Sequence, residues 1–142
     1  MNRELSYNDI GYGAATFKVD ETTITYLKTN YLDASTGKVD INGKKLAVKL
    51  SGDNTVGFGT STPAATDALF GIIVTYEQDG YEAVQYKGFV ENIAVNGAIA
   101  LGTTTLAVND KGVISSVTGS AGRANVTKAS TASDKKMTIL IG

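Results

Sequence analysis

The sequence predicts an all-β protein, a small antiparallel β-barrel or sandwich built from hairpins. Its 142 residues include 16 glycines and a single proline, together with many threonines, valines and alanines, which is typical of short strands joined by tight turns. Short runs of alternating or β-branched residues recur along the chain, with Gly-containing turns between them. The length fits one domain with its own core, and the apolar share of 42% fits a folded chain.

The strongest hairpin signal lies at residues 70–90, where a run of β-branched and aromatic residues is followed by an Asp-Gly turn. A three-residue loop at 78–80 sets Val74 opposite Val84 and places Gly80 where a left-handed residue is needed. A two-residue loop would instead oppose two glutamates, so the longer loop is predicted. The apolar face of this hairpin then comprises Phe70, Ile72, Val74, Tyr76, Val84, Tyr86 and Val90.

A second hairpin is predicted over residues 38–50. The Asn-Gly pair at 42–43 is the preferred sequence for a type I′ turn. A two-residue loop sets Val39 opposite Leu46 on one face and an aspartate opposite a lysine on the other, so turn, register and charge agree. The apolar face of this hairpin comprises Val39, Ile41, Leu46, Val48 and Leu50.

The other predicted strands are short and are separated by polar or Gly-containing segments. They cover residues 15–18, 22–28, 54–58, 92–95, 98–101, 103–108, 113–117, 123–128 and 136–141. Residues 22–28 could also form a helical turn, but four successive β-branched residues disfavour a helix. One helical turn is expected within residues 61–68, with Thr62 as its cap and Pro63 at its first position.

Residues 1–14 are predicted to be an N-terminal arm, and residues 15–142 the single β domain. The arm is polar and carries Tyr7, Ile10 and Tyr12. Arms with aromatic residues often dock on a neighbour, and tyrosine suits such half-wet contacts. The alternative is a frayed end or a first edge strand. We expect the partner contacts to include Tyr7, Ile10, Tyr12 and Phe17.

Few kinds of catalysis are open to this chain, because it contains no histidine and no cysteine. It therefore cannot form a Ser-His-Asp or Cys-His arrangement, a disulfide or a His/Cys zinc site. Paired carboxylates remain to be considered. The close pairs are Asp20 with Glu21 at a turn and Glu77 with Glu82 beside a hairpin tip, where charges normally face solvent. We therefore predict no catalytic residue and no enzymatic activity.

Ligand signals are equally weak. Residues 11–14 and 57–59 resemble parts of a phosphate-binding glycine loop, but neither lies between a strand and a helix. Asp53 and Asp110 could supply oxygen ligands to calcium, but no acidic residues at loop spacing surround them. The sequence therefore predicts no cofactor and no metal ion.

The charge and hydropathy of the chain indicate whether nucleic acid or a membrane is a partner. Thirteen basic and fourteen acidic residues give a formal net charge of -1, and the basic doublets at 44–45 and 135–136 each stand beside acidic residues. They predict solvated turns rather than a face for nucleic acid. No apolar run approaches the length of a membrane span, and the first residues lack the apolar core of a signal peptide. We therefore expect no nucleic-acid partner, no membrane partner and synthesis in the cytoplasm.

The second half of the chain carries a more specific set of motifs. Leu-Phe-Gly-Ile-Ile-Val-Thr-Tyr at 69–76 leads to the Asp-Gly turn and then to Val-Gln-Tyr-Lys-Gly-Phe-Val at 84–90. Residues 97–113 combine a Gly-bounded strand, Leu-Ala-Val and an Asn-Asp-Lys-Gly turn, and Gly-Arg-Ala at 122–124 precedes a closing apolar strand. This half resembles the small capsid decoration (cement) proteins of tailed bacteriophages. Residues 1–68 carry no matching motif.

The resemblance implies a non-catalytic structural protein that is made in the host cytoplasm and added to the outside of an icosahedral phage head. Such a protein binds the major capsid protein at local twofold or threefold junctions, often as a dimer or trimer, and its arm extends over neighbouring subunits. Two alternatives remain. One is a carbohydrate-binding β-module, although its usual tryptophan platform is absent here. The other is a structural subunit of a phage tail or fibre.

Overall fold

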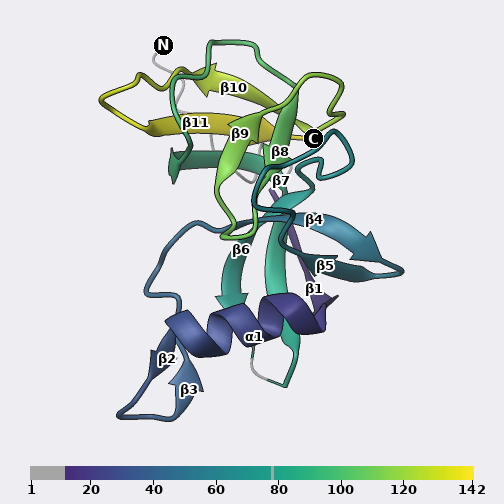
Figure 1. Ribbon diagram of the computed structural model, residues 1–142, viewed down its shortest axis with the longest axis vertical. Helices are drawn as coiled ribbons and strands as arrows, with labels where there is room; N and C mark the ends of the chain where they lie inside the picture. The colour runs from purple at the N-terminus through teal and green to yellow at the C-terminus, as the bar shows by residue number, and fades with distance from the viewer. Residues whose placement is uncertain (1–11, 78) are drawn as a thin grey trace.

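The computed structural model describes residues 12–77 and 79–142. Its fold is mostly β, as predicted, with five strands that close a mixed β-barrel (Figure 1). The ring closes because β1 pairs in parallel with β5 and antiparallel with β7. In ring order the barrel strands are β1 (Gly13–Val19), β5 (Thr55–Gly57), β4 (Ala47–Gly52), β6 (Gly71–Tyr76) and β7 (Tyr81–Ala94).

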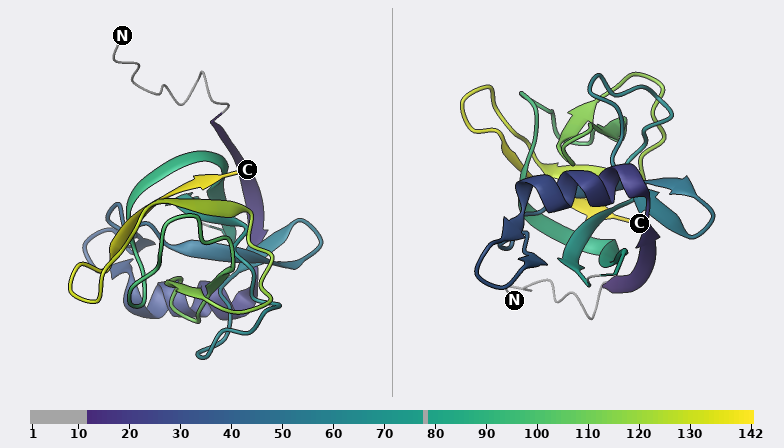
Figure 2. Two further views of the ribbon diagram at one scale, coloured as in Figure 1. Left: turned by 90° about the horizontal axis from the view of Figure 1, so that it is seen from above. Right: turned by 60° about the horizontal axis from the view of Figure 1, so that its bottom comes forward.

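The 14-residue strand β7 connects the barrel to a second layer. Its first half pairs with β1 and β6, and its second half pairs with β11 (Lys136–Ile141), which pairs with β10 (Ala124–Lys128). The change of partner falls at Gly88, whose φ of 105° is a conformation that glycine adopts without strain. Figure 2 shows the C-terminus beside β1, since both meet β7 at this point.

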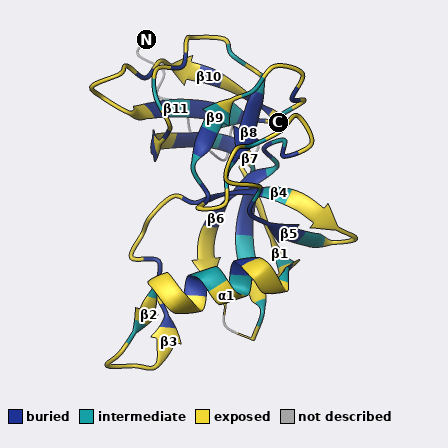
Figure 3. Ribbon diagram, viewed as in Figure 1, coloured by how far each residue is buried: buried dark blue, intermediate teal, exposed yellow. Residues whose placement is uncertain are grey.

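Two clusters of buried apolar side chains fill the molecule. Figure 3 shows β11 as largely buried or intermediate and β10 as largely exposed. The first cluster lies between the β7–β11–β10 layer and a small hairpin of β8 (Leu106–Val108) and β9 (Ile114–Ser116). The second fills the barrel and packs against the helix of residues 21–30. Its larger fully buried members are Val19, Leu27, Val48 and Val56.

The predicted strand at 22–28 is wrong, because these residues belong to helix α1 (Glu21–Asn30). Asp20 caps the helix by accepting a 2.9 Å hydrogen bond from the Thr23 backbone N–H. An acidic residue in the first turn and a lysine in the last also suit the helix dipole. Thr23 and Leu27, one turn apart, are both buried. Capping and packing therefore outweigh the few tenths of a kcal/mol that each β-branched residue costs a helix.

The central hairpin has the predicted register only near its tip. Tyr76 pairs with Glu82, as the three-residue loop requires. A bulge after Ile73 then shifts the ladder by one residue, so Ile73 rather than Val74 lies opposite Val84. The predicted place of Val74 on the apolar face is therefore wrong, and 47% of this residue is exposed. The bulge gives the barrel wall extra local twist.

The predicted turns are present in the backbone. Gly80 has a φ of 83°, which confirms its left-handed conformation. Asn42 and Gly43 have φ values of 53° and 70°, as a type I′ turn requires, and the Lys44 N–H bonds to the Ile41 carbonyl at 3.0 Å. Turn geometry depends on neighbouring residues alone, which explains why the sequence predicts it well.

The hairpin predicted across the Asn-Gly turn is wrong. The strand before it, β3 (Lys38–Val39), pairs with β2 (Leu32–Asp33), whereas β4 pairs with β5 and β6. Both edges of β4 are thus occupied within the barrel wall, which leaves no edge for β3. Leu50, predicted on the apolar face, is 52% exposed.

The remaining predictions are mixed. The strands at 15–18, 54–58, 103–108, 113–117, 123–128 and 136–141 are confirmed in type, with different ends. No strand forms at residues 98–101 and no helix at residues 61–68, both within the described part of the chain. The strand β1 begins at Gly13, so the last two residues of the predicted arm belong to the barrel. The rest of that arm up to residue 11 lies outside the described residues.

Candidate functional site

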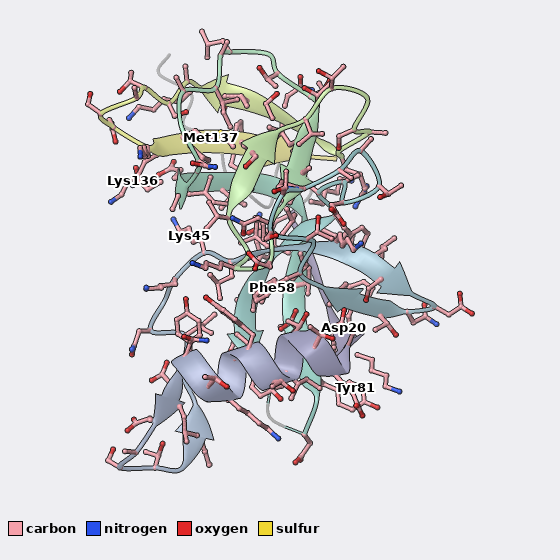
Figure 4. The ribbon with its side chains drawn as sticks, viewed as in Figure 1. Asp20, Lys45, Phe58, Tyr81, Lys136 and Met137 are labelled. Atoms are coloured by element: carbon pink, nitrogen blue, oxygen red, sulfur yellow. The ribbon has the colours of Figure 1, made fainter. Side chains whose placement is uncertain are left out.

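A cleft of ≈ 390 Å³ opens beside the first turn of α1. Its walls come from that turn, the β4–β5 hairpin, the residues after β5 and the β8–β9 turn. Figure 4 places Asp20 and Phe58 in this region, above the helix. The side chains that give the cleft its chemical character are Asp20, Tyr26, Lys49, Phe58, Thr60 and Asp110.

One wall of the cleft is built from the Gly-Phe-Gly segment at 57–59. A Cβ on Gly57 would overlap the carboxylate of Asp20, and a Cβ on Gly59 would overlap the carbonyl oxygen of Val108. Between them, the Phe58 N–H donates a 2.9 Å hydrogen bond to Thr23 Oγ1. The two glycines thus allow close packing of the chain against α1 and the β8–β9 turn.

Beside the cleft, Asp67 holds the loop of residues 60–68 in place. This carboxylate is only 2% exposed and accepts from Lys49 Nζ at 2.7 Å, Thr60 Oγ1 at 2.8 Å and the Ala64 N–H at 2.9 Å. Burial alone would raise its pKa, but these hydrogen bonds and the charge of Lys49 outweigh burial and hold the pKa at about 2. The same bonds explain why residues 61–68 form no helical turn, since the loop donates to a side chain instead.

A second carboxylate, Glu82, is fully buried in the barrel and neither of its oxygens has a hydrogen-bond partner among the described residues. Burial and the nearby charge of Asp20 raise its pKa to about 8. The expectation that Glu82 faces solvent is therefore wrong. The predicted register already set it opposite Tyr76 on the apolar face, and this signal could have located it.

Aromatic rings line the helix side of the cleft. Tyr26 meets Phe58 edge to face at 5.5 Å and Tyr31 at 6.3 Å between ring centroids, and Lys44 Nζ lies 5.5 Å from the centre of the Tyr31 ring. Burial raises the pKa of the Tyr26 hydroxyl, and the nearby Tyr31 and Asp110 raise it further. Within the cleft, Tyr26 and the small exposed part of Phe58 offer apolar surface beside the carboxylates of Asp20 and Asp110, a combination suited to a small polar ligand with apolar faces.

The basic doublets are exposed, as predicted. Lys45 Nζ donates to the backbone oxygen of Glu91 in β7, and Lys136 pairs with Ala94 further along the same strand. Figure 4 shows Lys45 and Lys136 on the same side of the molecule in that view.

The four predicted contact residues do not share one environment. Tyr7 and Ile10 lie outside the described residues. Tyr12, just before β1, is 42% exposed. Phe17 is half-buried and meets Phe70 edge to face, with 5.3 Å between the ring centroids. Besides Tyr12, the large apolar residues exposed in the described ranges are Leu32, Leu50, Val74, Tyr81 and Leu101.

Over residues 12–77 and 79–142, no group of three or more acidic, histidine or cysteine side chains is arranged to hold a metal ion. No helix of the described chain is long and apolar enough to cross a membrane. No protein-family model matches the sequence, and a comparison with curated proteins finds no similar one.

Proposed function

We propose that this protein is a non-catalytic structural protein that binds the outside of a phage capsid lattice and stabilises the head. The observation that carries the proposal is the place of β1. This strand is hydrogen-bonded on both edges, to β5 and β7, in a closed barrel. The aromatic-bearing segment of residues 1–12 directly precedes this strand of the barrel wall, with Tyr12 exposed at the junction.

The mechanism follows from mass action. A protein that binds only the assembled lattice stabilises that state by its binding free energy, repeated at each site. A stable interface buries roughly 1,600 Å² in total. The arm and the adjacent barrel rim could supply such a contact with the major capsid protein, and a dimer or trimer would match a local twofold or threefold junction. Nucleic acid is not proposed as a partner, because the formal net charge of -1 offers no general attraction for phosphates.

The test is co-sedimentation of the purified protein with expanded phage heads that lack their decoration layer. We expect saturable binding in a fixed ratio to the major capsid protein. Tyr12→Ala should weaken binding by about tenfold, which corresponds to about 1.4 kcal/mol for one well-packed aromatic contact. Tyr81→Ala is the matched control, because Tyr81 is similarly exposed, at 48% against 42%. No binding to well-formed heads would refute the proposal.

A carbohydrate-binding module is the second candidate, and the cleft beside α1 favours it. Tyr26 and Phe58 present ring surface there, next to Asp20 and Asp110. Sugars present apolar C–H faces and hydroxyls, which rings and carboxylates can contact together. A glycan array would test this candidate. Glycan binding that Tyr26→Ala abolishes, without any binding to phage heads, would favour it over the capsid role.

A further inference from the structure

The interior of the barrel contains an ionisable group with no partner. Glu82 is 0% exposed, and neither carboxylate oxygen has a hydrogen-bond partner in the described structure. It pairs with Phe17 of β1 on one side and with Tyr76 of β6 on the other, so its side chain lies on the inner face of three adjacent strands. A charged carboxylate in such a place is far costlier than a neutral one.

The charges around Glu82 give it no compensation. Asp20, at the junction of β1 and α1, is the charged group that acts on it, and Tyr76 contributes a buried phenol. No lysine or arginine of the described chain forms an ion pair with Glu82. The other charged side chains on the surrounding elements are exposed or paired elsewhere, namely Lys18, Glu21, Lys28, Lys49, Glu77 and Asp79.

Among the strands around Glu82, β1 buries the smallest share of its residues. Its one buried side chain is Val19 and Phe17 is half-buried, although the strand pairs with β7 over six residue pairs and with β5 over two. By contrast β6 buries four of its six residues. Asp20 follows β1 directly and is fixed by its helix-capping bond. Repulsion between Asp20 and an ionised Glu82 therefore acts at the junction of β1 and α1.

We propose that Glu82 is a proton-controlled latch for β1, so that the neutral carboxyl keeps the strand in the closed barrel and ionisation releases it. Residues 1–12 are joined directly to β1, so release of β1 would also release the attachment of these residues to the barrel, whichever partner they bind. A pKa of about 8 in the closed barrel, against 4.5 in the open state, places the change between about pH 4.5 and pH 8. The sign follows from linkage: a raised pKa in the folded state means that closure is favoured at low pH and loses support as pH rises toward 8.

Hydrogen exchange of the purified full-length chain tests the latch. With a pKa of about 8 in the closed state and 4.5 in the open state, the opening equilibrium should rise about 50-fold between pH 6 and pH 8. Protection of β1 amides, corrected for the intrinsic pH dependence of exchange, should fall by that factor in the wild type. Glu82→Gln should abolish the fall. Glu91→Gln is the matched control, because Glu91 is exposed on the same strand as Glu82, and it should behave as the wild type.

Two results would overturn the latch. One is that the protection of β1 amides from exchange does not change with pH. The other is that the amides of β10 and β11 lose as much protection as those of β1, which would mean global unfolding. If Glu82→Gln does not fold, the titration of each glutamate carboxyl can be followed in the wild type by carbon NMR instead. One carboxyl should titrate above pH 7 together with the loss of β1 protection. If every glutamate titrates near the ordinary glutamate pKa of 4.5, the proposal fails.

Discussion

The Asp67–Lys49 pair makes the stability of this protein dependent on acid in a calculable way. The folded-state pKa of Asp67 is about 2, against 3.8 without the fold. One pKa unit corresponds to about 1.4 kcal/mol, so the folded state gains about 2.5 kcal/mol from the ionised carboxylate. Asp67 is almost fully buried, so this gain is little reduced by solvent screening.

Because this pKa is lowered by folding, the gain is fully present above about pH 5 and is lost as pH falls toward 2. Asp67→Asn keeps the shape of the side chain but removes the charge. It should therefore be less stable than the wild type by about 2.5 kcal/mol at pH 7, and the difference should shrink toward zero near pH 2.

Urea unfolding followed by circular dichroism at pH 7, 4 and 2.5 would measure this. Asp53→Asn is the control, because Asp53 is exposed at the β4–β5 turn, and it should follow the wild type at every pH. If the difference between Asp67→Asn and the wild type stays constant from pH 7 to pH 2.5, folding does not lower the pKa of Asp67. The argument from its hydrogen bonds and from the charge of Lys49 would then be wrong.

Two glycine substitutions test the packing of the backbone. Gly59→Ala should cost more than about 2 kcal/mol, because the new methyl group would overlap a backbone carbonyl that cannot move aside. Gly52→Ala, where a Cβ meets only an ordinary contact at 3.6 Å, should change the urea midpoint little. Gly80→Val should cost about 1–2 kcal/mol, because a β-branched residue resists a φ of 83°. A melting temperature unchanged by Gly80→Val, with Gly80→Asn as the milder control, would contradict the turn geometry.

The sequence predicts the β class and most strand positions because both depend on local composition and alternation. The turns at 42–43 and at Gly80 are confirmed for the same reason. Strand pairing is different, because strands compete for partners that lie far away in the sequence. The edges of β4 are taken by β5 and β6, and nothing near the Asn-Gly turn reveals that competition. The bulge after Ile73 is likewise set by closure of the barrel.

The cleft could not be predicted, since it depends on α1 lying beside the β4–β5 hairpin. The sequence nevertheless contains the signals for that helix. Asp20 is a favoured N-cap residue and is followed by an acidic first turn. Ile24, Leu27 and Tyr31 then recur at the three- and four-residue spacing of a helix face. The low helix propensity of residues 22–25 is therefore a weaker indicator of their secondary structure than the N-cap and the apolar periodicity taken together.

The regions of the errors at α1 and at Glu82 adjoin each other in the fold. Val19, at the end of β1, donates to the carbonyl of Gly80 at 2.9 Å, and a Cβ on Gly80 would lie 3.3 Å from the side chain of Ile24 in α1. The helix therefore packs beside the end of the central hairpin, and Figure 1 shows it crossing there. The expectation that charges beside a hairpin tip face solvent holds for Glu77, which is exposed. Strand alternation instead directs Glu82, opposite Phe17 and Tyr76, into the closed interior, where its ionisation opposes closure of the barrel.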